Sequence, residues 1–157
     1  MNTKNDGKPY VVQISFPSCL EYVIPIRKFI SEVLVGNNYS QKFAYRSEVI
    51  VDEVCSNAVI YGSKTQDACI DFTCYIYEDH IEFQVKDQGG TKKDVERLKV
   101  AVNTAKEFQQ DQIDLLGSTH DGCLGMEIVR MLSEEVQLEF GENNVTTIRV
   151  VRKRKPA

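Results

Sequence analysis

The sequence predicts an α/β protein of the α+β kind: a two-layer sandwich in which helices cover one face of a mixed, mainly antiparallel sheet. Apolar residues recur at helical spacing over 20–62 and then alternate with polar ones over 68–86, which indicates helices followed by strands. Two pairs of expected strands are separated only by short turns, at 78–79 and 141–144, as in antiparallel hairpins. The expected element order is β α α β β α α β β.

The chain begins with one strand and one helix. Tyr10–Phe16 is the first expected strand, and the proline that follows closes it. Ser18 and Glu21 have the spacing of a capping box, which predicts a helix from there to Gly36, kinked or delayed by Pro25. The apolar positions of this helix are Leu20, Val23, Ile24, Ile30, Val33 and Leu34.

A second helix and a hairpin follow. Ser40 is expected to cap this helix, which ends at Gly62. From Ala68 the hydrophobic period changes to two, and the turn Glu78–Asp79 joins two strands. The residues predicted to face the core are Phe43, Ile50, Val54 and Ala58 on the helix, Ile70, Phe72, Cys74 and Ile76 on one strand, and Ile81, Phe83 and Val85 on the next.

The C-terminal half repeats this pattern of helices before strands. Val95, Leu98, Val102 and Ala105 mark a third helix, and Leu124, Ile128 and Leu132 a fourth. A second hairpin is expected from Val136–Phe140 and Val145–Val151, which flank the turn Gly141–Asn144.

Composition bounds the classes of function. The 157 residues include 19 Lys and Arg against 23 Asp and Glu, a net charge of −4, which argues against direct nucleic-acid binding. We expect one domain over 1–157, with a disordered N-terminus at 1–9 and a solvated basic tail at 152–157. No apolar segment has the length of a membrane span or signal peptide, so we expect a cytoplasmic protein without membrane contact.

Two acidic positions depart from the apolar pattern. Asp87 continues the inward phase of its strand, so its carboxylate must find a donor or hold a ligand, and Gly89 after it permits close approach of the backbone. Glu53 and Asn57 lie four residues apart on one helix face, where a carboxylate can take a proton and an amide oxygen can hold a hard cation. A simple strand-end turn and an exposed polar helix face are the alternatives.

Two further features lie in the C-terminal half. Gly122, Leu124 and Gly125 surround the start of the fourth helix, where free N–H groups and the helix dipole can face an anion. Thr146 is in phase with the inward residues of its strand. An ordinary glycine loop and a core threonine bonded to backbone are the alternatives that need no ligand.

In chain order, the four features resemble the sequence boxes of the GHKL ATPase superfamily, and within it the bacterial anti-sigma factor serine/threonine kinases. The resemblance covers about Val11 to Lys153 and is strongest over Val51–Gly62 and Gly122–Val136. The matching motifs are Glu53-x-x-x-Asn57-Ala58, Asp87-x-Gly89, Asp121-Gly122-x-Leu124-Gly125 and Val145-Thr146-Thr147.

The resemblance implies a Bergerat fold of the histidine-kinase-like ATPases and a kinase that uses ATP and Mg²⁺. It implies that the protein phosphorylates an anti-sigma-factor antagonist, binds a sigma factor and forms a homodimer. The implied roles are Glu53 as catalytic base, Asn57 as Mg²⁺ ligand, Asp87 as acceptor for the adenine amino group, Gly89 beneath the base, Gly122, Leu124 and Gly125 as the phosphate-binding loop, and Thr146 near adenine.

Two residues depart from the family pattern. Thr91 stands where a second glycine is usual after the aspartate, and Cys123 stands where a glycine is common in the phosphate loop. Neither departure removes a catalytic group.

The alternative function is a nucleotide-gated module that binds its partner without phosphorylating it. Glu53 distinguishes the two functions, because a protein that only binds its partner needs no general base.

Overall fold

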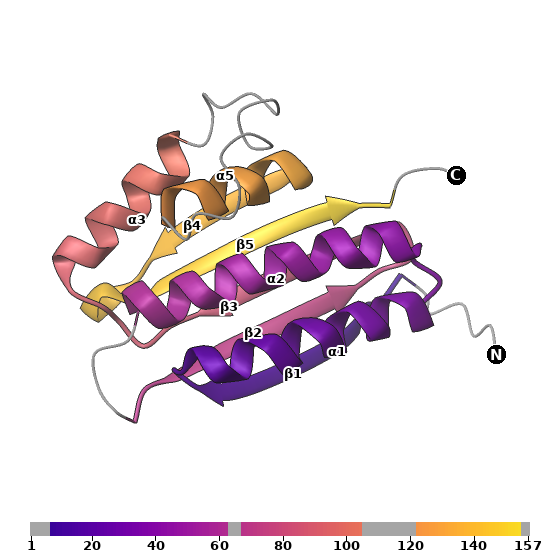
Figure 1. The fold of residues 1–157 in the computed structure, drawn as a ribbon, viewed down its shortest axis with the longest axis horizontal. Coiled ribbons are helices and arrows are strands. Elements are labelled where there is room, and N and C mark those ends of the chain that lie inside the picture. Colours follow the sequence, from indigo (N-terminus) through magenta and orange to yellow (C-terminus); the bar gives the residue numbers. More distant parts are fainter. Residues whose placement is uncertain (1–6, 63–66, 105–121, 155–157) are drawn as a thin grey trace.

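A five-stranded sheet carries the described helices on one face (Figure 1). The structure is a computed structural model that describes residues 7–62, 67–104 and 122–154. Its elements are β1 (Tyr10–Pro17), a 3₁₀ turn (Leu20–Tyr22), α1 (Val23–Gly36), α2 (Gln41–Gly62), β2 (Cys69–Ile76), β3 (His80–Lys86), α3 (Lys92–Thr104), α5 (Gly122–Leu132), β4 (Glu135–Phe140), a second 3₁₀ turn (Glu142–Asn144) and β5 (Thr146–Lys153). The predicted two-layer α/β class and element order are confirmed.

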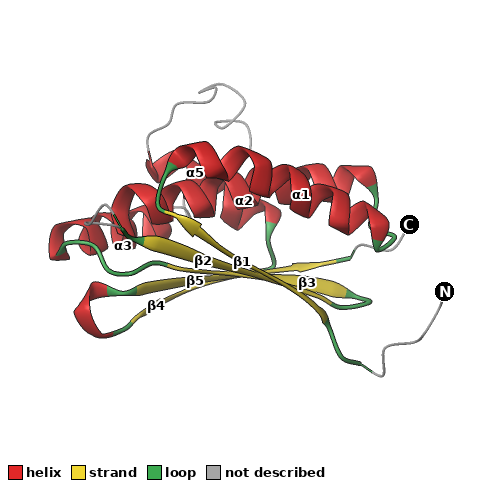
Figure 2. Ribbon diagram, turned by 90° about the horizontal axis from the view of Figure 1, so that it is seen from below, coloured by secondary structure: helices red, strands yellow, loops and turns green. Residues whose placement is uncertain are grey.

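The strand order is β1-β2-β3-β5-β4, and every pairing between these strands is antiparallel. The sheet expected to be mixed is thus wholly antiparallel within the described residues. Figure 2 shows the helices gathered on one side of the twisted sheet. An antiparallel sheet can leave its second face to solvent, which agrees with the alternation of apolar and polar residues along its strands.

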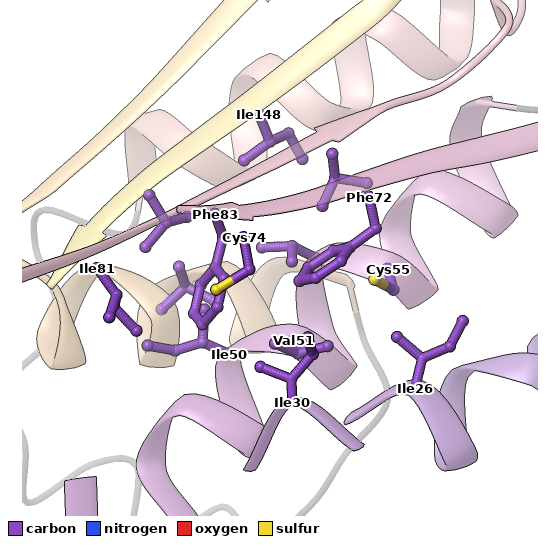
Figure 3. Packing of buried hydrophobic residues seen from close by; sticks show 14 of the residues in the cluster. Ile26, Ile30, Ile50, Val51, Cys55, Phe72, Cys74, Ile81, Phe83 and Ile148 are labelled. Carbon is purple, nitrogen blue, oxygen red and sulfur yellow. The ribbon is translucent and has the colours of Figure 1, made fainter. Parts of the chain in front are cut away.

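The core lies between the sheet and the helices α1, α2 and α5 (Figure 3). Phe72 of β2 and Phe83 of β3 form its centre, with ring centroids 5.7 Å apart. Ile30 of α1 and Ile50 of α2 are fully buried against this layer. The inward faces predicted for α2, β2 and β3 are confirmed, because all of their apolar residues named above are buried.

The predicted start of the first helix is wrong. The helix begins at Val23, after a short 3₁₀ turn. The N-cap residues of the turn and the helix, Cys19 and Tyr22, make no capping hydrogen bond with their side chains. Pro25 lies in the first turn of α1, where its missing N–H would be unpaired in any case, and this is where a helix tolerates proline. By contrast, Ser40 caps α2 as predicted, because its Oγ accepts the backbone N–H of Phe43 at 3.1 Å.

The inward faces of the other helices are only partly as expected. Leu20 of the first 3₁₀ turn and Ile24 of α1 are each 49% exposed, and Ile26 is buried instead. On α5, Leu132 packs against the core as predicted, but Met126 and Val129 are the buried residues, so the inward stripe is rotated by about a third of a turn from the predicted one. Val95 of α3 is buried as predicted, whereas the side chains of Leu98, Val102 and Leu124, and all of Ala105, lie outside the described part of the structure.

The solvated basic tail predicted from residue 152 is wrong for Arg152 and Arg154, whereas Lys153 is exposed. β5 continues to Lys153, and Arg152 is 5% exposed because the inward phase of the strand directs it into the core. Arg154 donates to the carbonyl oxygen of Asn38 at 2.8 Å and lies over the ring of Tyr39. At the other end, the structure describes residues 7–9 of the segment expected to be disordered and leaves 1–6 outside.

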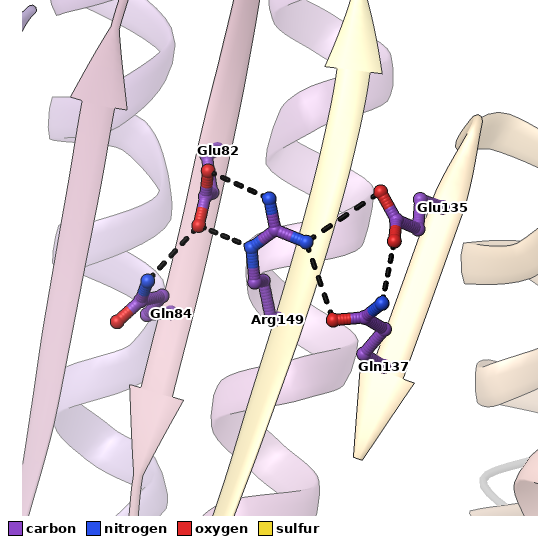
Figure 4. A network of polar contacts seen from close by, with 5 residues as sticks. All are labelled: Glu82, Gln84, Glu135, Gln137 and Arg149. Atoms are coloured by element: carbon purple, nitrogen blue, oxygen red, sulfur yellow. Dashed lines mark hydrogen bonds and ion pairs between the residues drawn. The ribbon is translucent and has the colours of Figure 1, made fainter. Parts of the chain in front are cut away.

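The outer face of the sheet carries a polar network centred on Arg149 (Figure 4). The guanidinium binds both carboxylate oxygens of Glu82 on β3 and reaches Glu135 and Gln137 on β4. Burial acts to raise the pKa of Glu82, but hydrogen bonds from Arg149 and Gln84 outweigh it, so the pKa is lowered. The charge pair therefore stabilises the junction of three strands.

Glu82→Gln should destabilise the protein by about 1 kcal/mol at neutral pH, the upper end for a partly exposed ion pair. Because the pKa of Glu82 is lowered by folding, its contribution is complete above the ordinary glutamate pKa and is lost as pH falls through the folded value. Urea unfolding of both proteins at neutral and acidic pH measures this. A difference in stability that does not shrink on acidification, or an equal loss in the exposed variant Glu139→Gln, would contradict it.

Candidate functional site

Asp87 joins the end of β3 to the start of β5. It continues the inward phase of β3, and only 6% of the residue is exposed. Its Oδ1 accepts the backbone N–H groups of Gly89 and Thr146, each at 2.9 Å, and its own N–H donates to the carbonyl oxygen of Thr146 at 3.1 Å. Three residues predicted to surround adenine are therefore in direct contact.

The carboxylate of Asp87 is held in a poorly hydrated place. Burial raises its pKa, and the two backbone hydrogen bonds offset part of this rise. Both bonds go to Oδ1, so Oδ2 accepts none from the described residues. A ligand that donates an N–H to Oδ2 would compensate the cost of burying this charge.

Gly62 is a site residue that the sequence analysis interpreted only as a helix end. A Cβ at this position would overlap the carboxylate of Asp87, so the last turn of α2 approaches Asp87 as closely as a glycine allows. The sequence signal for such a contact is weak, because a glycine at a helix C-terminus is common for conformational reasons alone.

Gly62→Ala should displace Asp87 or the end of α2, because the added methyl group has no room. We expect a loss of stability of about 1–3 kcal/mol, typical of overpacking, and weaker binding of any ligand held by Asp87. Gly36→Ala is the matched control, since Gly36 also ends a helix and a Cβ there meets nothing within 4 Å. Equal thermal stability of the two variants would show that Gly62 does not restrict Asp87.

Position 89 requires glycine for two reasons, its backbone conformation and the lack of space for a side chain. Its φ of +101° lies in the region that favours glycine. A Cβ there would also overlap the carbonyl oxygen of Asn143, in the turn between β4 and β5. Asn143 and Asn144 both have positive φ, of 57° and 61°, so this turn is itself tightly bent where it meets Gly89.

Thr91, which stands where the family has a second glycine, lies immediately before α3. Its carbonyl oxygen accepts the N–H of Val95 at 3.1 Å, the first hydrogen bond of that helix. Threonine is a favourable residue at this position. The departure from the family pattern thus has a local structural reason.

Glu53 and Asn57 lie on one face of α2, as their spacing predicts. Asn57 is 3% exposed, and its side-chain Nδ2 has no hydrogen-bond partner in the described structure. A buried amide without a partner is costly, which suggests that a ligand completes its surroundings. The carboxylate of Glu53, one turn earlier on α2, lies against Gly125 of α5.

The helix α5 meets α2 at Gly125. A Cβ on Gly125 would overlap the carboxylate of Glu53, so the two helices approach closely where the phosphate loop is predicted to end. Gly122 and Leu124 lie in the first turn of α5. The side chains of Leu124 and Cys123 are outside the described structure, as are residues 105–121.

Glu127 is a buried acidic residue on α5 that the sequence analysis missed. It is 2% exposed, its Oε2 has no hydrogen-bond partner in the described structure, and burial raises its pKa. The signal was its place between the apolar residues Met126 and Ile128. Glu127 lies three residues after Leu124, at the flank of the predicted stripe, but a charged residue gives no apolar signal and was therefore not assigned to the core.

The predicted residues form two groups along α2. Asp87, to which Gly89 and Thr146 donate, lies against Gly62 at the end of the helix. Asn57 and Glu53 lie five and nine residues earlier on α2, and Gly125 of α5 lies against Glu53. The spacing corresponds to about 14 Å of helix. The arrangement suits an elongated ligand with a hydrogen-bond donor at one end and negative charge at the other.

A family model, the histidine kinase-like ATPase domain, matches residues 16–152. The chain belongs to this family, as the sequence motifs predicted. Relatives include the serine-protein kinases RsbW of Bacillus pumilus, 26% identical over 140 residues, and of Staphylococcus epidermidis, 28% identical over 137. These alignments cover 82% and 86% of the chain, and 78% and 82% of the relatives.

Solved structures share the fold. A chain in the SiaB–SiaC complex from Pseudomonas aeruginosa has a TM-score of 0.67 and 13% identity, over 93% of this chain and 90% of that one. The RsbU and RsbW domains of Rv1364c from Mycobacterium tuberculosis give a TM-score of 0.64 and 15% identity, over 94% of this chain and 34% of that one. Among the described helices, none is long and apolar enough to cross a membrane.

Proposed function

We propose that this chain is an ATP-dependent serine/threonine protein kinase that phosphorylates an anti-sigma-factor antagonist and, as an anti-sigma factor, also binds a sigma factor. The observation that carries the proposal is the pair of groups along α2, Asp87 against Gly62 and Glu53 against Gly125. Membership of the ATPase family supports use of ATP, and the RsbW relatives named as serine-protein kinases support a protein hydroxyl as acceptor.

In the proposed complex, the adenine amino group donates to Asp87, with Gly89 beneath the base and Thr146 beside it. Gly122, Leu124 and Gly125 present the start of α5 to the phosphates, where the helix dipole favours negative charge. Asn57 Oδ1 is the proposed Mg²⁺ ligand because amide oxygens suit this cation. Its buried Nδ2, which has no partner among the described residues, could donate to a phosphate oxygen. The bound Mg²⁺ would neutralise charge on the phosphates.

The proposed reaction is an in-line phosphoryl transfer. The acceptor hydroxyl oxygen forms a bond to the γ-phosphorus of ATP while the bond to the bridging oxygen breaks, and ADP leaves with that electron pair. Glu53 takes the hydroxyl proton as general base. Since Gly125 lies against its carboxylate, the base and the phosphate-binding end of α5 are held side by side.

The alternative is a nucleotide-gated module that binds its partner without phosphorylating it. The structure of a complex between SiaB and SiaC shows that a chain of this fold can be found with a protein partner, and this favours partner binding in either case. We further propose a homodimer in the cytoplasm, formed as one kinase domain over 1–157 without nucleic acid or membrane contact.

The test is to incubate the purified chain with Mg²⁺, ATP labelled on the γ-phosphate and a lysate of its own organism. One small protein labelled on serine or threonine is the expected result, and the Glu53→Gln variant in the same lysate is the control. ATP binding without any labelled acceptor would favour the module that only binds. Absence of ATP binding by calorimetry would overturn both.

A further inference from the structure

Arg152 is a buried cation that the proposed reaction does not use. Only 5% of the residue is exposed. Its guanidinium donates to the carbonyl oxygens of Leu132 at 2.8 Å and Phe43 at 2.9 Å, and to Ser47 Oγ at 2.6 Å. It also lies 4.0 Å from the centre of the Phe43 ring. Burial lowers its pKa to about 10, so it stays charged at neutral pH.

The three acceptors belong to two helices. Leu132 is the last residue of α5, where carbonyl groups lack helical partners and the helix dipole is negative. Phe43 and Ser47 lie in the first two turns of α2 and are themselves linked, since Ser47 Oγ donates to the Phe43 carbonyl oxygen at 2.9 Å. One side chain from β5 therefore ties the end of α5 to the start of α2.

The other end of α5 contacts α2 at Gly125 and Glu53. From Gly125 to Leu132 the helix rises about 10 Å, and from Glu53 back to Ser47 α2 spans about 9 Å. The two contacts thus hold the helices side by side and antiparallel with a single register (Figure 1). The Arg152 contact consists of directional hydrogen bonds to both helices.

We propose that Arg152 is a positioning residue for phosphate binding: by fixing the register of α5 on α2, it places the start of α5 beside Glu53 and Asn57. The proposal rests on the function proposed above for the site itself. Asp87, Gly89 and Thr146 are held by β3 and β5 and do not depend on this register. Loss of Arg152 should therefore weaken binding of the phosphates and spare binding of the nucleoside.

The test compares ATP and adenosine affinities, measured by calorimetry with Mg²⁺, in the wild type, Arg152→Lys and Ser47→Ala. Lysine keeps the charge but cannot make three hydrogen bonds in a planar fork. We expect ATP affinity to fall about tenfold in Arg152→Lys, as for about 1.4 kcal/mol, with adenosine affinity changed less than about twofold. Ser47→Ala, which removes one acceptor, should give a smaller loss of the same kind.

Arg154→Met is the matched control, because Arg154 also binds carbonyl oxygens and an aromatic ring but contacts α1 and its following turn instead of α5. Its ratio of ATP to adenosine affinity should equal that of the wild type. Hydrogen exchange at Gly125 and Met126, measured without nucleotide, should be faster in Arg152→Lys than in Arg154→Met. An unchanged affinity ratio with unchanged exchange would overturn the positioning role, whereas failure of wild-type ATP binding would overturn the proposed function alone.

Discussion

Asp87→Asn should lower the affinity for ATP by about 10- to 100-fold while the protein stays folded. The amide oxygen of asparagine can still accept the N–H groups of Gly89 and Thr146, so the link between β3 and β5 persists. The negative charge that would accept the adenine amino group is lost, and a hydrogen bond to a charged group contributes about 1.5–3 kcal/mol.

Calorimetric titration with Mg²⁺ and ATP measures the effect. Asp71→Asn is the control, since Asp71 is an exposed aspartate whose side chain lies on the outer face of the sheet, opposite the face of Asp87. If Asp87→Asn binds ATP as tightly as the wild type, the assignment of Asp87 to adenine is wrong, whatever the activity of the protein.

Asp87→Asn should also change how the stability of the protein depends on pH. Burial raises the pKa of Asp87 in the folded protein, so the folded state holds its proton more tightly than the unfolded state. The stabilisation from that proton is present at low pH and is lost as pH rises through the folded pKa. Relative to the wild type, Asp87→Asn should therefore gain stability as pH rises, which thermal unfolding at acidic and neutral pH can show.

In the wild type, ATP affinity should change with pH in the opposite direction to the stability contribution of the Asp87 proton: it should rise as pH rises. A protonated carboxyl is a weaker acceptor, so affinity should fall as pH drops through the raised pKa of Asp87, and the fall should begin at a higher pH than for an ordinary aspartate. Asp87→Asn should not show this component, since the amide does not titrate.

Strand phase was the most reliable source of prediction. Residues of one parity on β3 and β5 face the core, and this placed Asp87 and Thr146 together before any contact was known. Arg152 has the same parity as Ile148 and Val150, so the same argument could have found it. A run of basic residues at the end of the chain led instead to the prediction of a solvated tail.

The glycines show what a single sequence does not contain. Gly62 is needed because Asp87, after β3, lies against it, and Gly125 because Glu53 of α2 does, and both contacts join residues far apart in the sequence. Helix periodicity gives the inward stripe of α2 correctly, but on α5 it missed Met126 and Val129, and Glu127 gave no apolar signal because it is charged. Such contacts depend on the tertiary arrangement, which local patterns specify only indirectly.

Glu53→Gln should lower phosphoryl transfer by about 10²- to 10⁴-fold, the range for loss of a general base. Glutamine has nearly the shape of glutamate, so it should fit against Gly125 without moving α5, and ATP affinity should stay close to that of the wild type. Partner binding should also survive, since the change removes only the proton acceptor.

The measurement is the single-turnover rate of transfer from ATP to the acceptor protein labelled in the lysate. Glu48→Gln is the matched control, because it makes the same change on the same helix at a residue paired with Arg27. Transfer as fast in Glu53→Gln as in the wild type would mean that Glu53 is not the general base.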